Sequence, residues 1–169
     1  MAEAGIFGEE ERIELIDGDL IDMAPISQAH AGVVSALTET LLLACAGRAI
    51  IWPQNPIRLD RLSEPQPDLA VLRRRADFYL GKRPGPADVL LVVEVAGNSL
   101  HYDRMVKMPL YARAGIAELW IVDLEQLVVD VYWTPVGNGY GNTNKCRSGD
   151  WLFLAGPPEI AVKLDLILE

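Results

Sequence analysis

The sequence predicts one α+β domain in which a mixed β-sheet is flanked by α-helices. Three observations predict this class. Short apolar, β-branched runs alternate with segments of helical periodicity. Residues 89–95 are apolar at both parities, which is typical of a central strand that is covered on both faces. The chain has 169 residues, half of them hydrophobic, so we expect residues 1–169 to bury a single core.

The N-terminal elements follow from turn and cap residues. Residues 13–16 and 20–23 flank Asp17-Gly18, a dipeptide that favours a β-hairpin turn. Ser27 is a good N-cap, and the apolar stripe that follows it predicts a long amphipathic helix from Ser27 to Cys45. We expect Gly47 to end this helix.

The later elements are inferred from short apolar runs and from loop residues. Residues 101–114 are expected to be helical, with Gly115 as the C-cap. No element is assigned to the Gly- and Asn-rich residues 137–150, and the Gly/Pro-rich residues 81–86 predict a loop. Strands are expected at residues 49–52, 56–59, 69–72, 89–95, 119–122, 127–133 and, as an edge strand, 151–154.

Two carboxylates stand beside or within apolar strand segments. Asp68 opens the run at 69–72, Glu94 lies in the run at 89–95, and Lys107 follows 13 residues after Glu94. A charged side chain in such a run is costly unless something pairs with it. Two acids and a lysine are what a magnesium-dependent phosphodiesterase needs, because carboxylates hold the ion and a lysine orients or deprotonates the water. Without metal the acids repel, so one of them is expected to have a raised pKa.

Four sequence blocks, taken together and in this order, resemble a known family over roughly residues 11–165. The blocks are IELIDGDL at 13–20, PDLA at 67–70, VVEV at 92–95, and YDRMVK at 102–107 continuing to WIVD at 120–123. They resemble the Uma-two family, restriction-endonuclease-like proteins of the PD-(D/E)XK nuclease superfamily. The resemblance implies a restriction-endonuclease-like core with an N-terminal hairpin. It also implies a Mg²⁺ or Mn²⁺ site and the hydrolysis of phosphodiester bonds in nucleic acid, with DNA as the expected substrate.

The resemblance also implies roles for individual residues. Asp68, Glu94 and the backbone carbonyl of Val95 would hold the metal, and Lys107 would be catalytic. Glu14 matches an acid that such proteins place beside the metal site. As a possible accessory residue, His30 matches a family histidine that could contact phosphate or a metal-bound water.

The lysine departs from the plainest form of the superfamily. That form has lysine two residues after the second carboxylate, where this chain has Ala96. Family members commonly move the lysine to the next helix, where Lys107 stands. A helix would place Asp103, Lys107 and Tyr111 on one face, although Pro109 implies that it starts near the lysine or bends there.

Structural alternatives accompany these assignments. Asp68 could be a strand-entry residue, Glu14 a hairpin residue, His30 a helix-start residue, and Lys107 a solvated lysine paired with Asp103. The alternative at the level of function is a nuclease-fold binding or regulatory domain that has lost turnover. The acidic charge and the missing Glu-x-Lys lysine favour it.

The net charge of −9 argues against tight, non-specific DNA binding. It is unevenly spread, because residues 1–22 hold eight acids and one arginine, whereas residues 58–83 hold seven basic and four acidic residues. One face could therefore meet a phosphate backbone. Alternatively, Arg73-Arg74-Arg75 simply closes a strand with a solvated turn.

Cysteine usage and hydropathy predict a cytoplasmic protein. Cys45 and Cys146 have neither a CxxC spacing nor histidine partners, which predicts free thiols. The first twenty residues contain five glutamates and no apolar signal core, and no run approaches the roughly 18 apolar residues of a membrane span. A homodimer is possible, because an edge strand such as 127–133 could pair with a second copy.

Overall fold

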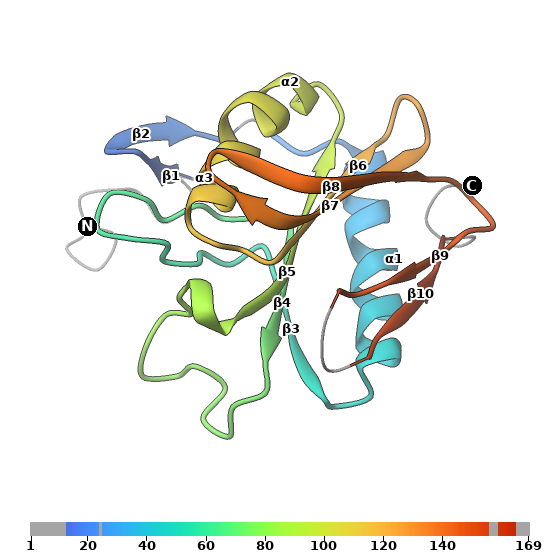
Figure 1. Ribbon diagram of the computed structural model, residues 1–169, viewed down its shortest axis with the longest axis horizontal. Helices are drawn as coiled ribbons and strands as arrows, with labels where there is room; N and C mark the ends of the chain where they lie inside the picture. Colours follow the sequence, from blue (N-terminus) through green and yellow to red (C-terminus); the bar gives the residue numbers. More distant parts are fainter. Residues whose placement is uncertain (1–12, 24, 156–158, 165–169) are drawn as a thin grey trace.

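The computed structural model describes residues 13–23, 25–155 and 159–164, and a six-stranded sheet forms its centre (Figure 1). The strand order is β3-β4-β5-β6-β7-β8, and every neighbouring pair is antiparallel except β5 and β6, which are parallel. The strands are β3 (Ala49–Pro53), β4 (Leu69–Arg73), β5 (Val89–Ala96), β6 (Glu118–Asp123), β7 (Val128–Val136) and β8 (Gly139–Cys146). The predicted mixed sheet is confirmed.

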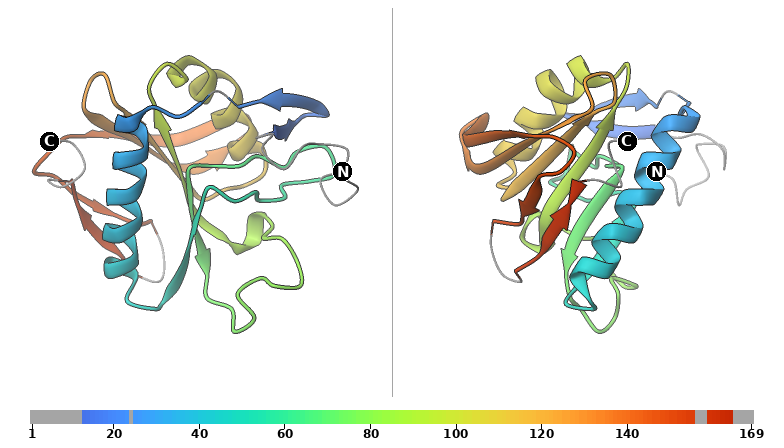
Figure 2. Two further views of the ribbon diagram at one scale, coloured as in Figure 1. Left: turned by 180° about the vertical axis from the view of Figure 1, so that it is seen from behind. Right: turned by 90° about the vertical axis from the view of Figure 1, so that its right-hand side faces the viewer.

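Helices cover both faces of this sheet (Figure 2). Alternate residues of a strand point to opposite faces, and β5 accordingly divides its side chains between two hydrophobic clusters. Leu91 and Val93 pack in the cluster that contains Leu37 of α1 (Gln28–Cys45), whereas Val92 packs in the cluster that contains Leu110. Leu110 belongs to a continuous helical segment made of α2 (Leu100–Tyr102), the π-helical turn η3 (Asp103–Lys107) and α3 (Met108–Arg113).

Two small hairpins flank this core. One pairs β1 (Ile13–Ile16) with β2 (Asp19–Asp22), and the other pairs β9 (Trp151–Phe153) with β10 (Ala161–Lys163). The turn of the first has φ +50° at Asp17 and +94° at Gly18, the two positive values of a type I′ turn. The Gly18 N–H donates to the carbonyl of Leu62, which ties this hairpin to a neighbouring loop. The remaining element is the 3₁₀ turn η2 (Pro86–Asp88).

Three expectations about strands and two about helix ends are wrong. Residues 56–59 form no strand, because Ile57 donates to the carbonyl of Pro65, and proline has no N–H to return the bond. Residues 139–146 do form a strand, β8, despite their Gly and Asn content, because β7 provides a full partner. Because β8 pairs with it, β7 is an interior strand of the sheet rather than an edge strand. Helix α1 ends at Cys45, and its C-cap is Ala46, in the left-handed conformation with φ +46°, rather than Gly47. Likewise the C-cap of α3 is Ala114 rather than Gly115.

Cys45 and Cys146 are free thiols, as predicted, and both are buried. Within the described part of the chain, none of the helices has the length and apolar character needed to cross a membrane.

Candidate active site

The register of two neighbouring strands brings the two predicted carboxylates together. Leu69 of β4 pairs with Val93 of β5, so continuing that register by one residue places Asp68 opposite Glu94. Residues directly opposite each other in an antiparallel pair share one face of the sheet. Neighbouring strands lie about 4.8 Å apart, a spacing at which two side chains can reach one ion. Both side chains are buried, with 7% of Asp68 and 3% of Glu94 exposed.

The residues just before β4 also determine the hydrogen bonding of the Val95 backbone. Its N–H donates to Asp68 Oδ2 at 2.8 Å instead of continuing the ladder. Because the N–H and C=O of one strand residue point to the same side, the Val95 carbonyl faces this side as well. Continuing the register by one more residue places Pro67 opposite, and proline has no N–H to offer that carbonyl. The Pro67-Asp68 pair thus leaves an oxygen acceptor beside two carboxylates.

Lys107 faces the carboxylates rather than bulk solvent. Its Nζ lies 2.9 Å from Glu14 Oε1 and 3.2 Å from Glu94 Oε1, and only 5% of the residue is exposed. The Tyr111 hydroxyl donates to the same Glu94 Oε1 at 2.6 Å. As the i, i+4 spacing predicted, both residues project from one helix face toward Glu94.

The π turn η3 accommodates Pro109. The N–H of Met108 donates to the carbonyl of Asp103, five residues earlier, and the proline that follows has no N–H to donate. The helical segment therefore runs on from Leu100 to Arg113 with one wide turn, instead of starting at Lys107. Asp103 and Lys107, the two ends of that turn, are both buried.

Three further polar groups complete the surroundings. Glu14 Oε1 accepts the backbone N–H of Gln66 at 2.7 Å, which fixes the hairpin carboxylate beside the lysine. His30 Nε2 lies 2.8 Å from Asp68 Oδ1, and because a carboxylate only accepts, that nitrogen carries the proton. Ser99 Oγ donates to Asp103 Oδ2 at 2.7 Å.

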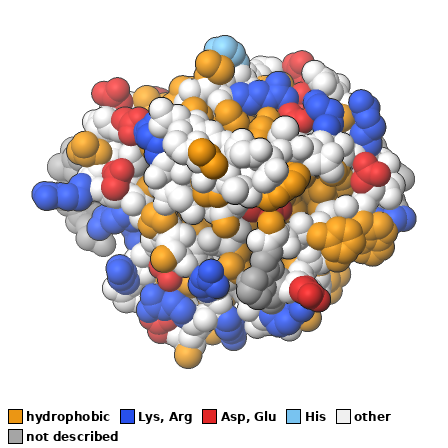
Figure 3. Space-filling view, in the orientation of Figure 1, with side chains coloured by type: hydrophobic (Ala, Val, Ile, Leu, Met, Phe, Trp, Pro, Cys, Tyr) orange, Lys and Arg blue, Asp and Glu red, His pale blue; other side chains and the backbone are white. Residues whose placement is uncertain are grey.

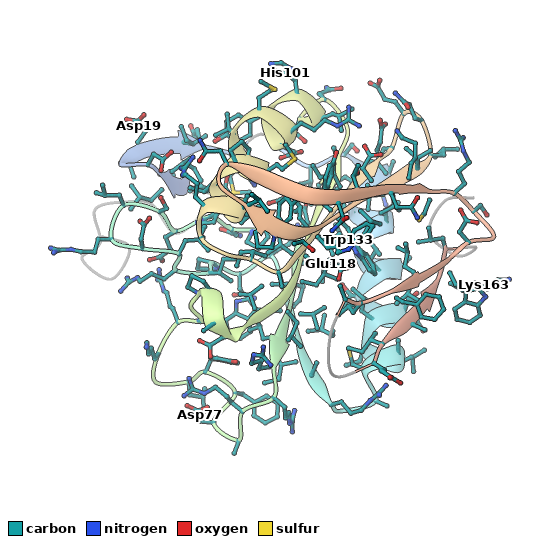
Figure 4. All side chains as sticks on the ribbon, in the orientation of Figure 1. Asp19, Asp77, His101, Glu118, Trp133 and Lys163 are labelled. Atoms are coloured by element: carbon teal, nitrogen blue, oxygen red, sulfur yellow. The ribbon has the colours of Figure 1, made fainter. Side chains whose placement is uncertain are left out.

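A cavity of about 440 Å³ opens beside these groups. Its lining includes every residue that the sequence predicted for the site: Glu14, His30, Asp68, Glu94, Val95 and Lys107. The other histidine of the chain, His101, points away from the body of the molecule at the top of Figure 4. The structure therefore gathers six residues from β1, α1, the start of β4, β5 and η3 around one space.

Burial governs the protonation of the cluster. Desolvation raises the pKa of Glu94 well above its ordinary value, and the Lys107 ammonium offsets only part of this effect. Burial likewise raises the pKa of Asp103. Burial alone would lower the pKa of Lys107, but Glu94 and Glu14 leave it above its ordinary value, so the lysine stays charged. The predicted raised carboxyl pKa is thus found at Glu94, with burial as its largest cause.

The donor set fits a divalent ion that keeps much of its water. Within the described residues, no three His, Cys, Asp or Glu side chains converge as a ready-made metal cage. Mg²⁺, however, is usually held by one or two carboxylates together with waters. Glu94 Oε2 has no hydrogen-bond partner among the described residues, and each Asp68 oxygen keeps a second lone pair. With the Val95 carbonyl, these oxygens match what such an ion takes.

The basic run at Arg73-Arg74-Arg75 lies away from this site. Asp68 precedes β4 and the arginines follow it, a separation of about 16 Å at 3.3 Å per residue. Arg75 is ion-paired with Asp77, and the guanidinium of Arg74 lies 4.3 Å above the ring of Phe78. On the face in Figure 3, Lys and Arg side chains are scattered among acidic and apolar ones. The local-turn interpretation of this run therefore agrees better with the structure than a phosphate-binding face.

A mixed sheet with two carboxylates at adjoining strands and a lysine on the following helix defines a restriction-endonuclease-like nuclease fold. The chain belongs to the Uma2 family, whose model, described as "Putative restriction endonuclease", matches residues 2–165. A crystal structure described as a "putative nuclease belonging to DUF820", from Anabaena variabilis, has the same fold, with a TM-score of 0.74 at 14% identity. The match covers 98% of this chain and 94% of that one. No curated protein matches the chain.

Two residues have a larger part in the site than the sequence indicated. The sequence predicts only that Tyr111 shares a helix face with Lys107, yet its hydroxyl donates a hydrogen bond to Glu94. Asp103 was considered only as a partner of Lys107, yet it is a further buried carboxylate that lines the cavity. Their signal was present in the i, i+4, i+8 spacing with Lys107, but that spacing does not reveal what the helix face meets.

Proposed function

We propose that this protein is a Mg²⁺- or Mn²⁺-dependent endonuclease that hydrolyses phosphodiester bonds of DNA. Asp68, Glu94 and the Val95 carbonyl would hold the ion, which when bound activates water and polarises the scissile phosphate. The observation that carries the proposal is the buried Lys107 ammonium, which lies within 3.2 Å of Glu94 and faces the cavity that Asp68 also lines. Family membership and fold support the same reaction class.

The other residues would act by positioning. Glu14 is a second carboxylate partner of the lysine, so that the ammonium stays in place to orient the water and offset phosphate charge. Tyr111 fixes one oxygen of Glu94 and leaves the other available. His30 fixes Asp68 from the α1 side and lines the cavity, where it could also contact a phosphate oxygen.

A catalytically silent binding or regulatory domain is the second candidate. It is favoured by one observation: both Asp68 oxygens and Glu94 Oε1 already accept hydrogen bonds from the protein. In that case the same buried network would serve structure, and metal would bind weakly or not at all.

Calorimetric titration of Mn²⁺ into wild type and Glu94→Gln separates the two candidates. Plasmid and single-stranded DNA are then incubated with both proteins, and Asp77→Asn, an exposed acid that is ion-paired with Arg75 away from the cavity, serves as the control. We expect metal binding and cleavage in wild type and in the control, and neither in Glu94→Gln. Metal binding without cleavage of either DNA would favour the silent domain, and no metal binding in wild type would refute the metal site.

We also propose that residues 1–169 act as one domain in the cytoplasm and that two copies associate through β8. Within the described residues β8 is an end strand of the six-stranded sheet, whereas β7, the edge strand that the sequence predicts, is paired on both sides. An unpaired strand edge is a template for pairing with a second chain. Light scattering after size-exclusion chromatography checks this, and a mass near 18.6 kDa at micromolar concentration would refute the dimer.

A further inference from the structure

The candidate cavity is larger than the proposed chemistry requires. Its volume of about 440 Å³ lies in the range of small-molecule pockets, roughly 300–1,000 Å³. A metal ion with a few waters, each taking about 30 Å³ of liquid volume, fills only part of it. The lining of the cavity also includes apolar residues from β2 and from the segment that leads into α1. These residues, which we call the apolar wall, are Ile21, Met23, Pro25 and Ile26.

Charge limits what can fill this space. The described residues that line the cavity include five carboxylates, on Glu14, Asp22, Asp68, Glu94 and Asp103, but a single lysine and no arginine. A continuous phosphate backbone is normally met by several Lys and Arg side chains. The cavity therefore suits one phosphate, neutralised by the metal and Lys107, and an uncharged group beside it.

Two further features of the lining suit a planar, polar-edged group. The Tyr102 hydroxyl is buried and has no hydrogen-bond partner among the described residues, although Tyr102 lines the cavity. A buried hydroxyl without a hydrogen-bond partner costs free energy, and a ligand that supplies the partner removes this cost. Asn98 and Ser99, at the end of β5, add amide and hydroxyl groups to the same lining.

We propose that this space is a nucleobase subsite, which takes the unpaired base of a nucleotide next to the scissile phosphate. The base would lie against the apolar wall, with its polar edge toward Tyr102 and Asn98. A paired base inside a duplex cannot enter such a pocket without leaving the stack. The substrate is accordingly a single strand or an unpaired strand end rather than continuous duplex DNA. This inference rests on the proposed function, because it places the scissile phosphate at Asp68 and Glu94.

The test measures binding by fluorescence anisotropy, in Ca²⁺ and with strand integrity checked on a gel. The probe is a labelled oligothymidylate of about ten nucleotides, within the span of known single-strand sites. It is compared with the same strand annealed to its complement and with an abasic sugar–phosphate strand of equal length. We expect the single strand to bind at least about tenfold more tightly than either, as the loss of base contacts implies.

Two cavity variants and a matched control locate the subsite. Ile26→Ala and Tyr102→Phe should each weaken oligothymidylate binding by about three- to tenfold, from lost apolar contact and a lost hydrogen bond, and should leave abasic-strand binding unchanged. Leu80→Ala is the control, because Leu80 is 90% exposed and is not part of the lining. Neither Ile26 nor Tyr102 is proposed to touch the metal, so Mn²⁺ binding should persist.

The outcomes distinguish this inference from the proposed function. Equal binding of duplex and single strand, or variants that match Leu80→Ala, would overturn the base subsite even if Mn²⁺-dependent cleavage persists. If wild type neither binds Mn²⁺ nor cleaves DNA, the proposed nuclease function itself is overturned. A single-strand preference that falls about three- to tenfold in Ile26→Ala and in Tyr102→Phe, but not in Leu80→Ala, would support the subsite.

Discussion

At the scale of single residues, the site is one lysine among buried acids. Glu14, Glu94 and Asp103 are each less than 5% exposed, and Lys107 is the cation whose charge bears on all three. Burying several carboxylates with one partner opposes stability, since paired charges only partly recover their desolvation cost. The divalent ion proposed for this site would supply the missing positive charge.

Replacement of the lysine should therefore affect the fold as well as the chemistry. Lys107→Met leaves the acids without a cation, and breaking a buried pair costs about 3–5 kcal/mol of unfolding free energy. Urea denaturation without metal measures this loss, with Lys82→Met, an exposed lysine, as the control. If Lys107 were only a surface lysine, Lys107→Met and Lys82→Met would lower the free energy of unfolding by equally small amounts. Cleavage by Lys107→Met is expected to fall at least about a hundredfold.

Glu94 should give the metal-free protein a characteristic pH dependence. Its folded-state pKa is raised above the ordinary 4.5, mainly by burial, so the folded chain binds this proton more tightly than the unfolded chain. The stabilisation is complete below pH 4.5 and is lost as the pH rises through the raised pKa. Urea unfolding in EDTA from about pH 5 to 8 should therefore show a falling free energy of unfolding, as linkage requires.

Glu94→Gln tests the origin of that slope. The amide cannot titrate, so its free energy of unfolding should change less over the same pH range, while the surface variant Glu39→Gln should keep the wild-type slope. Asp103, whose pKa burial also raises, would account for the slope that remains. Parallel curves for wild type and Glu94→Gln would contradict the assignment.

At the scale of elements, a hairpin, two strand ends and a π turn position the site. Glu14 lies on β1, so its distance to Lys107 depends on the hairpin that Asp17 and Gly18 close. Gly18 has φ +94°, a conformation that a side chain disfavours, whereas Gly32 on α1 has open space where a Cβ would be. The two glycines thus provide a matched pair of substitutions.

Gly18→Ala should destabilise the protein by about 1–2 kcal/mol through backbone strain, and should lower activity by displacing the hairpin. Gly32→Ala should instead stabilise it by about 0.5–1 kcal/mol, because alanine is the better helix former. Thermal unfolding of both variants measures the difference. The same sign for both changes would show that the turn conformation does not limit the hairpin.

Local signals predicted the elements that local chemistry determines. The Asp17-Gly18 turn, the Ser27 cap and the doubly apolar β5 all form as expected. Residues 139–146 were missed because their strand depends on β7, a partner that no local pattern reveals. The π turn could not be predicted either. Pro109 indicates that the helix is irregular near Lys107, but the kind of irregularity follows only from the contacts of Lys107 with Glu94 and Glu14. The pairing of site residues across distant elements is likewise a tertiary property.

At the scale of the whole molecule, charge and site geometry point to the same kind of substrate contact. The chain carries a net charge of −9, and its run of three arginines is at the far end of β4, with Arg75 and Arg74 engaged by Asp77 and Phe78. Long-range attraction of a polyanion is therefore weak. Affinity for nucleic acid should come from the cavity itself, through the metal, Lys107 and base contacts.

Weak phosphate contact has a measurable consequence in the salt dependence of binding. For single strands, the slope of log K against log salt is about −0.7 for each neutralised phosphate, so one or two contacts give a slope of about −1. Raising KCl from about 50 to 200 mM should then weaken oligothymidylate binding less than about tenfold, whereas at the same coefficient six to ten contacts would weaken it about 300- to 20,000-fold. Anisotropy titrations at several salt concentrations measure this slope. A slope steeper than about −4 would mean that a basic track outside the cavity contacts the strand, because the cavity's single lysine cannot supply it.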